Sequence, residues 1–183
     1  QSKTKKRKVV SILLIIFFGF GITCLVGFSA FMIYVKAKAD PLFDTANLNT
    51  VELTRLYDKD GKEFAKLGSE KREKVSYEQL PEVLIDAIVA TEDSRFFQHN
   101  GFDAPRFLKA ALGQLAGHSG AGGASTLSMQ VVKNSFTDKK KQKTAGKDGI
   151  VRKFEDIYLA VFKLEKKYSK EEIIEYYVNN HFL

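Results

Sequence analysis

Residues 9–35 form an uninterrupted run of 27 uncharged and mostly apolar positions. A helix of that length would measure about 40 Å, which exceeds the roughly 30 Å hydrocarbon core of a bilayer. The tripeptide Ala37-Lys38-Ala39 resembles a signal-peptidase site. However, the apolar region of a cleaved signal peptide is only about 7–15 residues long. We therefore predict one uncleaved membrane-spanning helix.

Charge is distributed unevenly about this run. The formal net charge is +7, and the five basic side chains of residues 3–8 supply most of it. The positive-inside rule therefore predicts a cytoplasmic N-terminus and places residues 36–183 outside the cell membrane. That outer part carries 24 basic and 22 acidic side chains. Such a balance argues against a nucleic-acid partner, which would need a basic stripe on the folded part.

Cysteine and histidine usage limits the metal chemistry. The single cysteine, Cys24, lies inside the apolar run, so an intrachain disulfide and a cysteine-based zinc site are both excluded. The three histidines (His99, His118 and His181) have no short metal-ligand spacing. We therefore expect no required metal or cofactor, although a divalent ion could stimulate activity by bridging an anionic ligand.

The pattern of the sequence predicts four segments. Residues 1–8 are a basic tail, 9–35 the membrane helix, 36–75 a polar connector with a β-hairpin, and 76–183 a mainly helical domain. The hairpin is expected at Leu53–Tyr57 and Glu63–Leu67, around an Asp/Gly turn. Helices are expected from Leu80-Pro81 with a stripe reaching Phe96, over 107–115, from Ser125-Thr126, over about 150–165, and from the capping box of Ser169 and Glu172.

Glu92 is the first candidate for chemistry. It follows Ile85 and Ile88 on one apolar helical stripe, where a carboxylate loses hydration and becomes a usable acid or base near neutral pH. The alternative is an ordinary surface acid at the end of a helix. Position alone does not choose between them.

The second candidate is Gly122-Gly123-Ala124-Ser125-Thr126, at the end of a glycine-rich loop over residues 118–124. The loop leads into a helix at Ser125-Thr126, and a helix N-terminus of this kind can bind phosphate through its backbone N–H groups. Gln130 and Lys133 follow on the same helix. The plain alternative is a helix start without a ligand.

The third candidate is Arg152 with Glu155, spaced i,i+3 on a helix. They are either a surface ion pair or a second carboxylate with a cation facing a cleft. The lysines that precede them at 139–147 suit a solvated loop or contact with anionic lipid headgroups.

Four signatures in order resemble a known family. They are residues 92–101 (EDSRFFQHNG), residues 123–134 (GASTLSMQVVKN), the group Arg152, Lys153 and Glu155, and residues 170–179. Over residues 54–183 the chain resembles the peptidoglycan glycosyltransferase domain of class A, bifunctional penicillin-binding proteins. The resemblance implies a mainly α, lysozyme-like fold, incomplete at its C-terminus, behind one transmembrane helix and a short β-hairpin. It also implies polymerisation of lipid II into glycan strands with inversion and release of undecaprenyl diphosphate.

The resemblance also implies roles for particular residues. Glu92 would be the general base, and Glu155 would assist at the donor diphosphate. The expected substrate-binding residues are Asp93, His99, Lys109, Ser125, Thr126, Gln130, Lys133, Asn134, Arg152 and Lys153. Two positions depart from the family pattern: Met129 replaces the first of two adjacent glutamines, and Lys109 stands where arginine is usual.

Two alternatives to a glycosyltransferase stay open. One is a lysozyme-type hydrolase that cleaves glycan with Glu92 as general acid, and the other is a non-catalytic membrane-anchored scaffold. The expected partners are lipid II, a lipid-linked glycan strand, the cell membrane and other cell-wall synthesis proteins. The hairpin predicts a transpeptidase domain downstream, because it is typical of the bifunctional enzymes.

Overall fold

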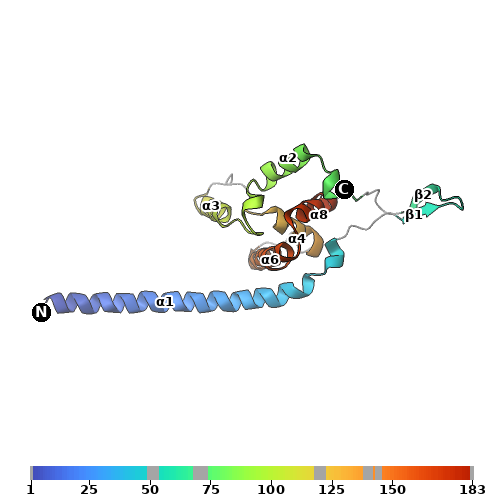
Figure 1. Cartoon of the computed structure of the whole chain (residues 1–183). Helices are drawn as coiled ribbons and strands as arrows, with labels where there is room; N and C mark the ends of the chain where they lie inside the picture. Colours follow the sequence, from blue (N-terminus) through green and yellow to red (C-terminus); the bar gives the residue numbers. More distant parts are fainter. Residues whose placement is uncertain are drawn as a thin grey trace. The chain divides into compact units, whose positions relative to one another are not determined.

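The structure is a computed structural model of the chain (Figure 1). It describes residues 2–48, 54–67, 74–117, 123–137, 142 and 146–181. The chain divides into two compact units, Gln1–Lys38 and Ala39–Leu183. Each is described separately below.

The first unit is a single helix, α1 (Ser2–Ala39). Ile15 and Phe17 are each 70% exposed, and most large apolar side chains along the helix are exposed to a similar degree. Side chains of this kind suit a lipid environment rather than water. The stretch Ser11–Leu42 is long and apolar enough to cross a membrane, as the sequence predicts.

The residues after α1 correct the prediction of a polar connector. They form two short 3₁₀ turns, η1 (Asp40–Leu42) and η2 (Thr45–Leu48). The ring of Phe43 lies 5.0 Å from that of Phe136, and Leu48 is 1% exposed. Asp40 accepts a hydrogen bond of 3.0 Å from the hydroxyl of Tyr158. Residues 40–48 belong to the folded unit, because Leu48 is buried in its core and Phe43 and Asp40 contact side chains of that unit.

The expected hairpin is confirmed. Strands β1 (Thr54–Tyr57) and β2 (Glu63–Leu67) pair antiparallel. The Asp58 carboxylate accepts hydrogen bonds from the amides of Asp60 and Lys62 at 2.9 Å, and so closes the turn.

Helices make up the rest of the described domain. Its longer elements are α2 (Glu82–Glu92), α3 (Ala104–Leu115), α4 (Leu127–Phe136), α6 (Gly146–Leu159) and α8 (Lys170–His181). The shorter elements are η3 (Tyr77–Gln79), η4 (Phe96–Gln98), the π-turn η5 (Ala160–Leu164) and α7 (Glu165–Lys167). The capping box is confirmed: the Ser169 amide donates to Glu172 and the Glu172 amide to the Ser169 hydroxyl.

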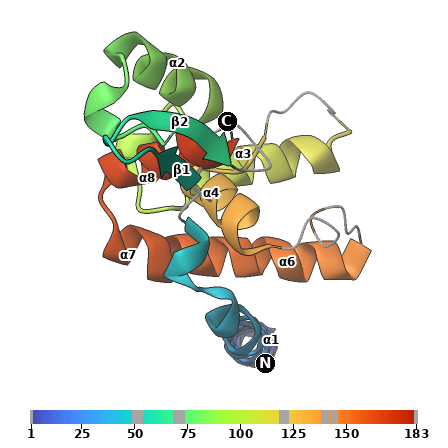
Figure 2. The same ribbon diagram turned by 90° about the vertical axis from the view of Figure 1, so that its right-hand side faces the viewer.

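Helix α4 forms the centre of the core. It packs against α6 and α8, and both views place it between them (Figures 1 and 2). Leu127, Val131 and Val132 are fully buried, as are Ile173 and Ile174 on α8. A helix buried over most of its surface is a rigid support, so the polar residues on its remaining face are held in fixed positions.

Helix α2 is shorter than the sequence predicts. It ends at Glu92, and Phe96 lies in η4 instead of on the same helical stripe. Asp93 leaves the helical conformation, with φ −154° and ψ 73°, and its carboxylate is fully buried. Glu92 is therefore the last residue of a helix, next to a sharp turn of the chain.

Gly101 lies where the turn after α2 meets η5. Its φ is +84°, and a Cβ there would come within 3.0 Å of the Ala160 carbonyl group. We expect Gly101→Ala to destabilise the domain by about 2–5 kcal/mol, because left-handed strain adds to a backbone clash. Gly117→Ala is the matched control, since Gly117 has φ +75° but no neighbour within 4 Å of a Cβ. Equal losses in denaturant unfolding would contradict the role given to the close approach.

Candidate active site

A polar cleft of about 380 Å³ lies among α2, α3, α4 and α6. It combines two carboxylates, four cationic side chains and several smaller polar groups. The residues that line it are Thr91, Glu92, Arg106, Gly123, Ser125, Met129, Gln130, Lys133, Asn134, Arg152, Lys153 and Asp156. Seven of the predicted site residues meet here, from α2, α4, α6 and the loop before α4: Glu92, Ser125, Gln130, Lys133, Asn134, Arg152 and Lys153.

Glu92 enters the cleft from the last turn of α2. Its Oε2 accepts a hydrogen bond of 2.9 Å from Nε2 of Gln130 on α4. Behind it lies Tyr177 of α8, which is 1% exposed. Burial, and secondarily the charge of Glu92, raises the pKa of Tyr177 to about 12. Glu92 is thus half-buried, oriented by an amide and open to the cleft, as a general base must be.

Lys153 and Ser125 are in direct contact at the lining of the cleft. The Lys153 Nζ donates a hydrogen bond of 2.6 Å to the Ser125 Oγ. Burial lowers the pKa of Lys153, and the neighbouring cations Arg152 and Lys133 lower it further, while Asp156 opposes them. A partly desolvated ammonium group attracts an anionic ligand more strongly than one in bulk water does.

Asp156 is the second carboxylate of the cleft. It is 3% exposed and accepts a hydrogen bond of 3.2 Å from Nη1 of Arg152. Burial raises the pKa of Asp156 to about 6, despite the opposing effects of Arg152 and Lys153. The Nε of Arg152 is buried and has no hydrogen-bond partner within the part of the chain that the structure describes.

The expectation that Glu155 faces the cleft is wrong. Glu155 does not line it, and Asp156 takes that place. Successive residues are about 100° apart around a helix, so Glu155 lies about 200° from Lys153, whereas Asp156 lies between Arg152 and Lys153 on one face. The i,i+3 spacing allows Arg152 and Glu155 to share a helical face. Because Lys153 also lines the cleft, the face of α6 toward the cleft is the one that carries Arg152, Lys153 and Asp156.

Four other residues expected to bind substrate lie outside the cleft lining: Asp93, His99, Lys109 and Thr126. Lys109 is exposed on α3. Thr126 is fully buried, where its hydroxyl donates to the Gly101 carbonyl at 2.7 Å and caps α4 by accepting from the Met129 amide. Asp93, His99 and Thr126 therefore support the site from behind its lining.

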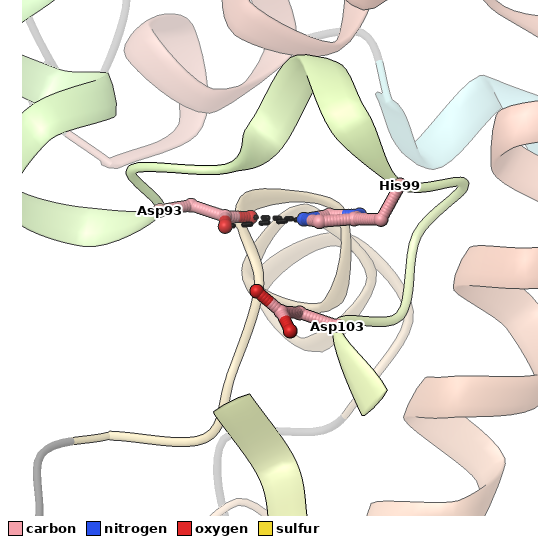
Figure 3. A group of neighbouring side chains, drawn as sticks. All are labelled: Asp93, His99 and Asp103. Carbon is pink, nitrogen blue, oxygen red and sulfur yellow. Dashed lines mark hydrogen bonds and ion pairs between the residues drawn. The ribbon is translucent and has the colours of Figure 1, made fainter. Parts of the chain in front are cut away.

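Asp93 is the buried centre of that support. Figure 3 shows its carboxylate and the ring of His99 pointing toward each other, with both oxygens 3.1 Å from His99 Nε2. The same carboxylate accepts from the Leu127 amide at 3.0 Å. It therefore ties the end of α2 to the first turn of α4 and to the chain after η4.

Asp93, His99 and Asp103 could in principle hold a metal ion, because one ligand atom from each lies within 4.8 Å of the others. Arginines already neutralise both carboxylates. Arg95 binds Asp103, and Nη1 of Arg106 is 3.7 Å from Asp93. A dication would have to displace these cations, so the donor set fits a structural ion-pair network better than a metal centre.

Lys170 holds this same region from α8. Its Nζ donates to the carbonyl of His99 and to Glu165, both at 2.7 Å, and lies 4.2 Å from the centre of the Phe96 ring. Glu165 also accepts from the hydroxyl of Ser128 on α4. The turn that follows Glu92 is therefore fixed from two helices.

Sequence reasoning missed Arg106 and Asp156. Arg106 reads as an ordinary residue of α3, and nothing in its spacing points to the cleft. The i,i+4 spacing of Asp156 with Arg152 indicates an ion pair on one helical face, but it does not place that face at the cleft. The glycine-rich positions 118–122 and Lys139, Lys140, Lys141 and Lys143 lie outside the described residues.

A second, apolar cavity of about 420 Å³ adjoins the cleft, and the two share Gly123 and Lys153. Its other lining residues come from α3, α6 and the loop before α4: Phe107, Ala110, Ala111, Ala124, Ile150 and Phe154. A cationic cleft next to an apolar cavity suits an amphiphilic ligand with an anionic group at the junction.

Comparison with known proteins identifies the domain. A family model described as transglycosylase matches residues 60–183, which is more than half of the chain. The chain belongs to the transglycosylase family. The fold of this transglycosylase domain is therefore the lysozyme-like, mainly helical fold expected from the sequence.

Relatives match along most of the transglycosylase chain. Penicillin-binding protein 1A/1B of Bacillus subtilis is 41% identical over 145 residues, which cover 79% of this chain and 15% of the relative. Penicillin-binding protein 1A of Vibrio cholerae is 36% identical over 182 residues, 98% of this chain and 20% of the relative. The corresponding protein of Streptococcus oralis is 35% identical over 87% of this chain and 24% of its own length. The chain thus spans between a seventh and a quarter of these relatives.

Proposed function

We propose that this domain polymerises lipid II into glycan strands at the outer face of the cell membrane. The observation that carries the proposal is the cleft itself, which holds an oriented carboxylate, Glu92, together with Arg152 and Lys153. Hydrolysis of a glycan does not require a cationic wall such as the one formed by Arg152 and Lys153. Transfer from a lipid diphosphate does require one, because negative charge develops on the leaving group. The relatives named as penicillin-binding proteins support the same reaction class.

In the proposed reaction Glu92 takes the proton from a hydroxyl of the acceptor sugar. The resulting oxygen attacks the anomeric carbon of the donor from the face opposite the diphosphate. The bond between that carbon and the diphosphate oxygen breaks, so configuration inverts and undecaprenyl diphosphate leaves with the electron pair. Arg152 and Lys153 offset the charge that develops on the leaving diphosphate, and arginine suits it as a bidentate donor.

Asp156 takes the role that the sequence assigned to Glu155. Its carboxylate binds Arg152 at 3.2 Å and lies on the same helical face as Lys153. We therefore assign it to orienting these two cations at the donor diphosphate. The chain's own side chains supply every group used in this scheme, and no metal is required by it.

The apolar cavity beside Lys153 suits the first isoprene units of the lipid. It shares Gly123 and Lys153 with the cleft, so a diphosphate at the cationic wall would place its prenyl chain against Phe107 and Phe154. Helix α1 would hold the domain at the membrane where such a lipid resides, with the N-terminus cytoplasmic and the catalytic domain outside.

The test uses the full-length protein in detergent with fluorescent lipid II. We expect strands that lengthen with time on gels. Shortening of preformed glycan without growth would favour the lysozyme-type hydrolase. Binding of lipid II without turnover would favour the scaffold and direct attention to Met129, where the family more often has glutamine.

A further inference from the structure

Arg106 joins two segments of the cleft through their backbones. Its Nη1 donates a hydrogen bond of 2.6 Å to the carbonyl of Glu92, and its Nε donates one of 2.8 Å to the carbonyl of Gly123. The Glu92 carbonyl is at the C-terminal end of α2, where carbonyl groups have no partner within the helix. Arg106 therefore satisfies an acceptor that the helix leaves open.

Glu92 is consequently held at two points by two different helices. Arg106 on α3 fixes its main chain, and Gln130 on α4 fixes its carboxylate at 2.9 Å. The Gln130 side chain alone would leave the backbone of Glu92, the last residue of α2, free to fray. The arginine alone would leave the carboxylate free to rotate.

The second hydrogen bond of Arg106 links Glu92 to the segment that carries Ser125. Gly123 comes two residues before Ser125, which binds Lys153. The Arg106 guanidinium group thus connects the backbone at Glu92 to the backbone at Gly123, which leads to Ser125.

The arginine is itself held in place and balanced in charge. The Asp103 carboxylate accepts a hydrogen bond of 2.8 Å from the amide of Arg106 in the first turn of α3. Asp93 lies 3.7 Å from Nη1 and is fully buried. Only a planar fork reaches two acceptors in different directions, and a lysine ammonium cannot span both.

We propose that Arg106 is a positioning residue that sets the placement of Glu92 relative to the Ser125–Lys153 wall. This inference rests on the function proposed above. Because misplacement of a catalytic group by about 1 Å can cost about 10²-fold in rate, loss of Arg106 lowers kcat of lipid II polymerisation on that order and changes KM by less than about threefold.

The experiment compares Arg106→Ala and Arg106→Lys in the full-length protein. We expect the alanine variant to lose about 10²-fold in kcat and to regain part of it with added guanidinium ion, and the lysine variant to remain at least about tenfold below the parent. Arg55→Lys, an exposed residue of the hairpin, is the inert control. Arg95→Lys is the matched control, since Arg95 supports Asp103 without touching Glu92.

Three results would overturn the proposal. One is a loss confined to KM, which would make Arg106 a substrate contact. The second is an equal loss in Arg95→Lys. The third is unchanged activity in Arg106→Ala while the parent polymerises lipid II.

Hydrogen–deuterium exchange separates this inference from the proposed function. Loss of Arg106 should speed amide exchange in the last turn of α2, whatever the substrate is. Faster exchange in a protein whose parent does not polymerise lipid II would support the positioning role and reject the proposed function. Unchanged exchange would reject the positioning role.

Discussion

We expect Glu92→Gln to lower the rate of lipid II polymerisation by about 10³-fold, which is within the usual contribution of a general base. Glutamine keeps the size of the side chain and its contact with Gln130, but it cannot accept the proton of the acceptor hydroxyl. A loss of that size corresponds to about 4 kcal/mol of transition-state stabilisation. Polymer length on gels, measured in the full-length protein, checks the prediction.

The control for this variant is Glu82→Gln. Glu82 begins the same helix and is exposed outside the cleft, so its substitution should leave the rate within about twofold. Binding of lipid II by Glu92→Gln should persist, because the cationic wall is unchanged. Strand growth at the parental rate in Glu92→Gln would remove the base role and, with it, the mechanism proposed above.

Asp156→Asn is expected to have the second-largest effect, about 10²-fold on the rate. The asparagine still accepts a hydrogen bond from Arg152 but no longer carries the charge that orients Arg152 and Lys153. Because the pKa of Asp156 is about 6, the parental rate should rise as pH increases through that value. The rise in rate near pH 6 should be absent from the pH–rate profile of Asp156→Asn.

Glu155→Gln is the matched control for that variant, because it changes the adjacent carboxylate in the same way. The cleft geometry predicts a much smaller loss for Glu155→Gln than for Asp156→Asn. A larger loss for Glu155→Gln would assign the orienting role to Glu155 and would contradict the placement of Asp156 on the cleft face of α6.

The stability of the parent protein should respond to pH in the opposite direction to its activity, because both depend on ionisation of Asp156. The pKa of Asp156 is raised in the folded state, from an ordinary 3.8 to about 6, so the folded protein holds this proton more tightly than the unfolded chain does. The resulting stabilisation is complete below about pH 4 and is lost as pH rises through 6. From pH 4 to pH 8, Asp156→Asn should therefore gain up to roughly 3 kcal/mol relative to the parent. A pH-independent difference in denaturant unfolding would contradict this account.

Local patterns in the sequence determined the elements of this protein and their approximate ends. An uncharged run of 27 residues predicts α1, because apolar length is a local property. The Asp/Gly turn predicts the hairpin, and Ser169 with Glu172 predicts the start of α8, because turns and caps depend on residues a few positions apart. The signatures around Glu92, Ser125 and Arg152 likewise indicated the family and most of the cleft lining.

Only the tertiary structure decided which groups face the cleft and which support it. Asp93 and Thr126 have the chemistry of ligand-binding residues, but packing against α4 turns them inward to satisfy buried backbone groups. Asp156 faces the cleft in place of Glu155 because the face of α6 is set by its packing on α4, and spacing along α6 alone leaves that rotation open. Arg106 contributes to the site because the C-terminal end of α2 lies within hydrogen-bond distance of its side chain. A helix terminus leaves carbonyl groups without partners, and only the fold brings a distant side chain to them.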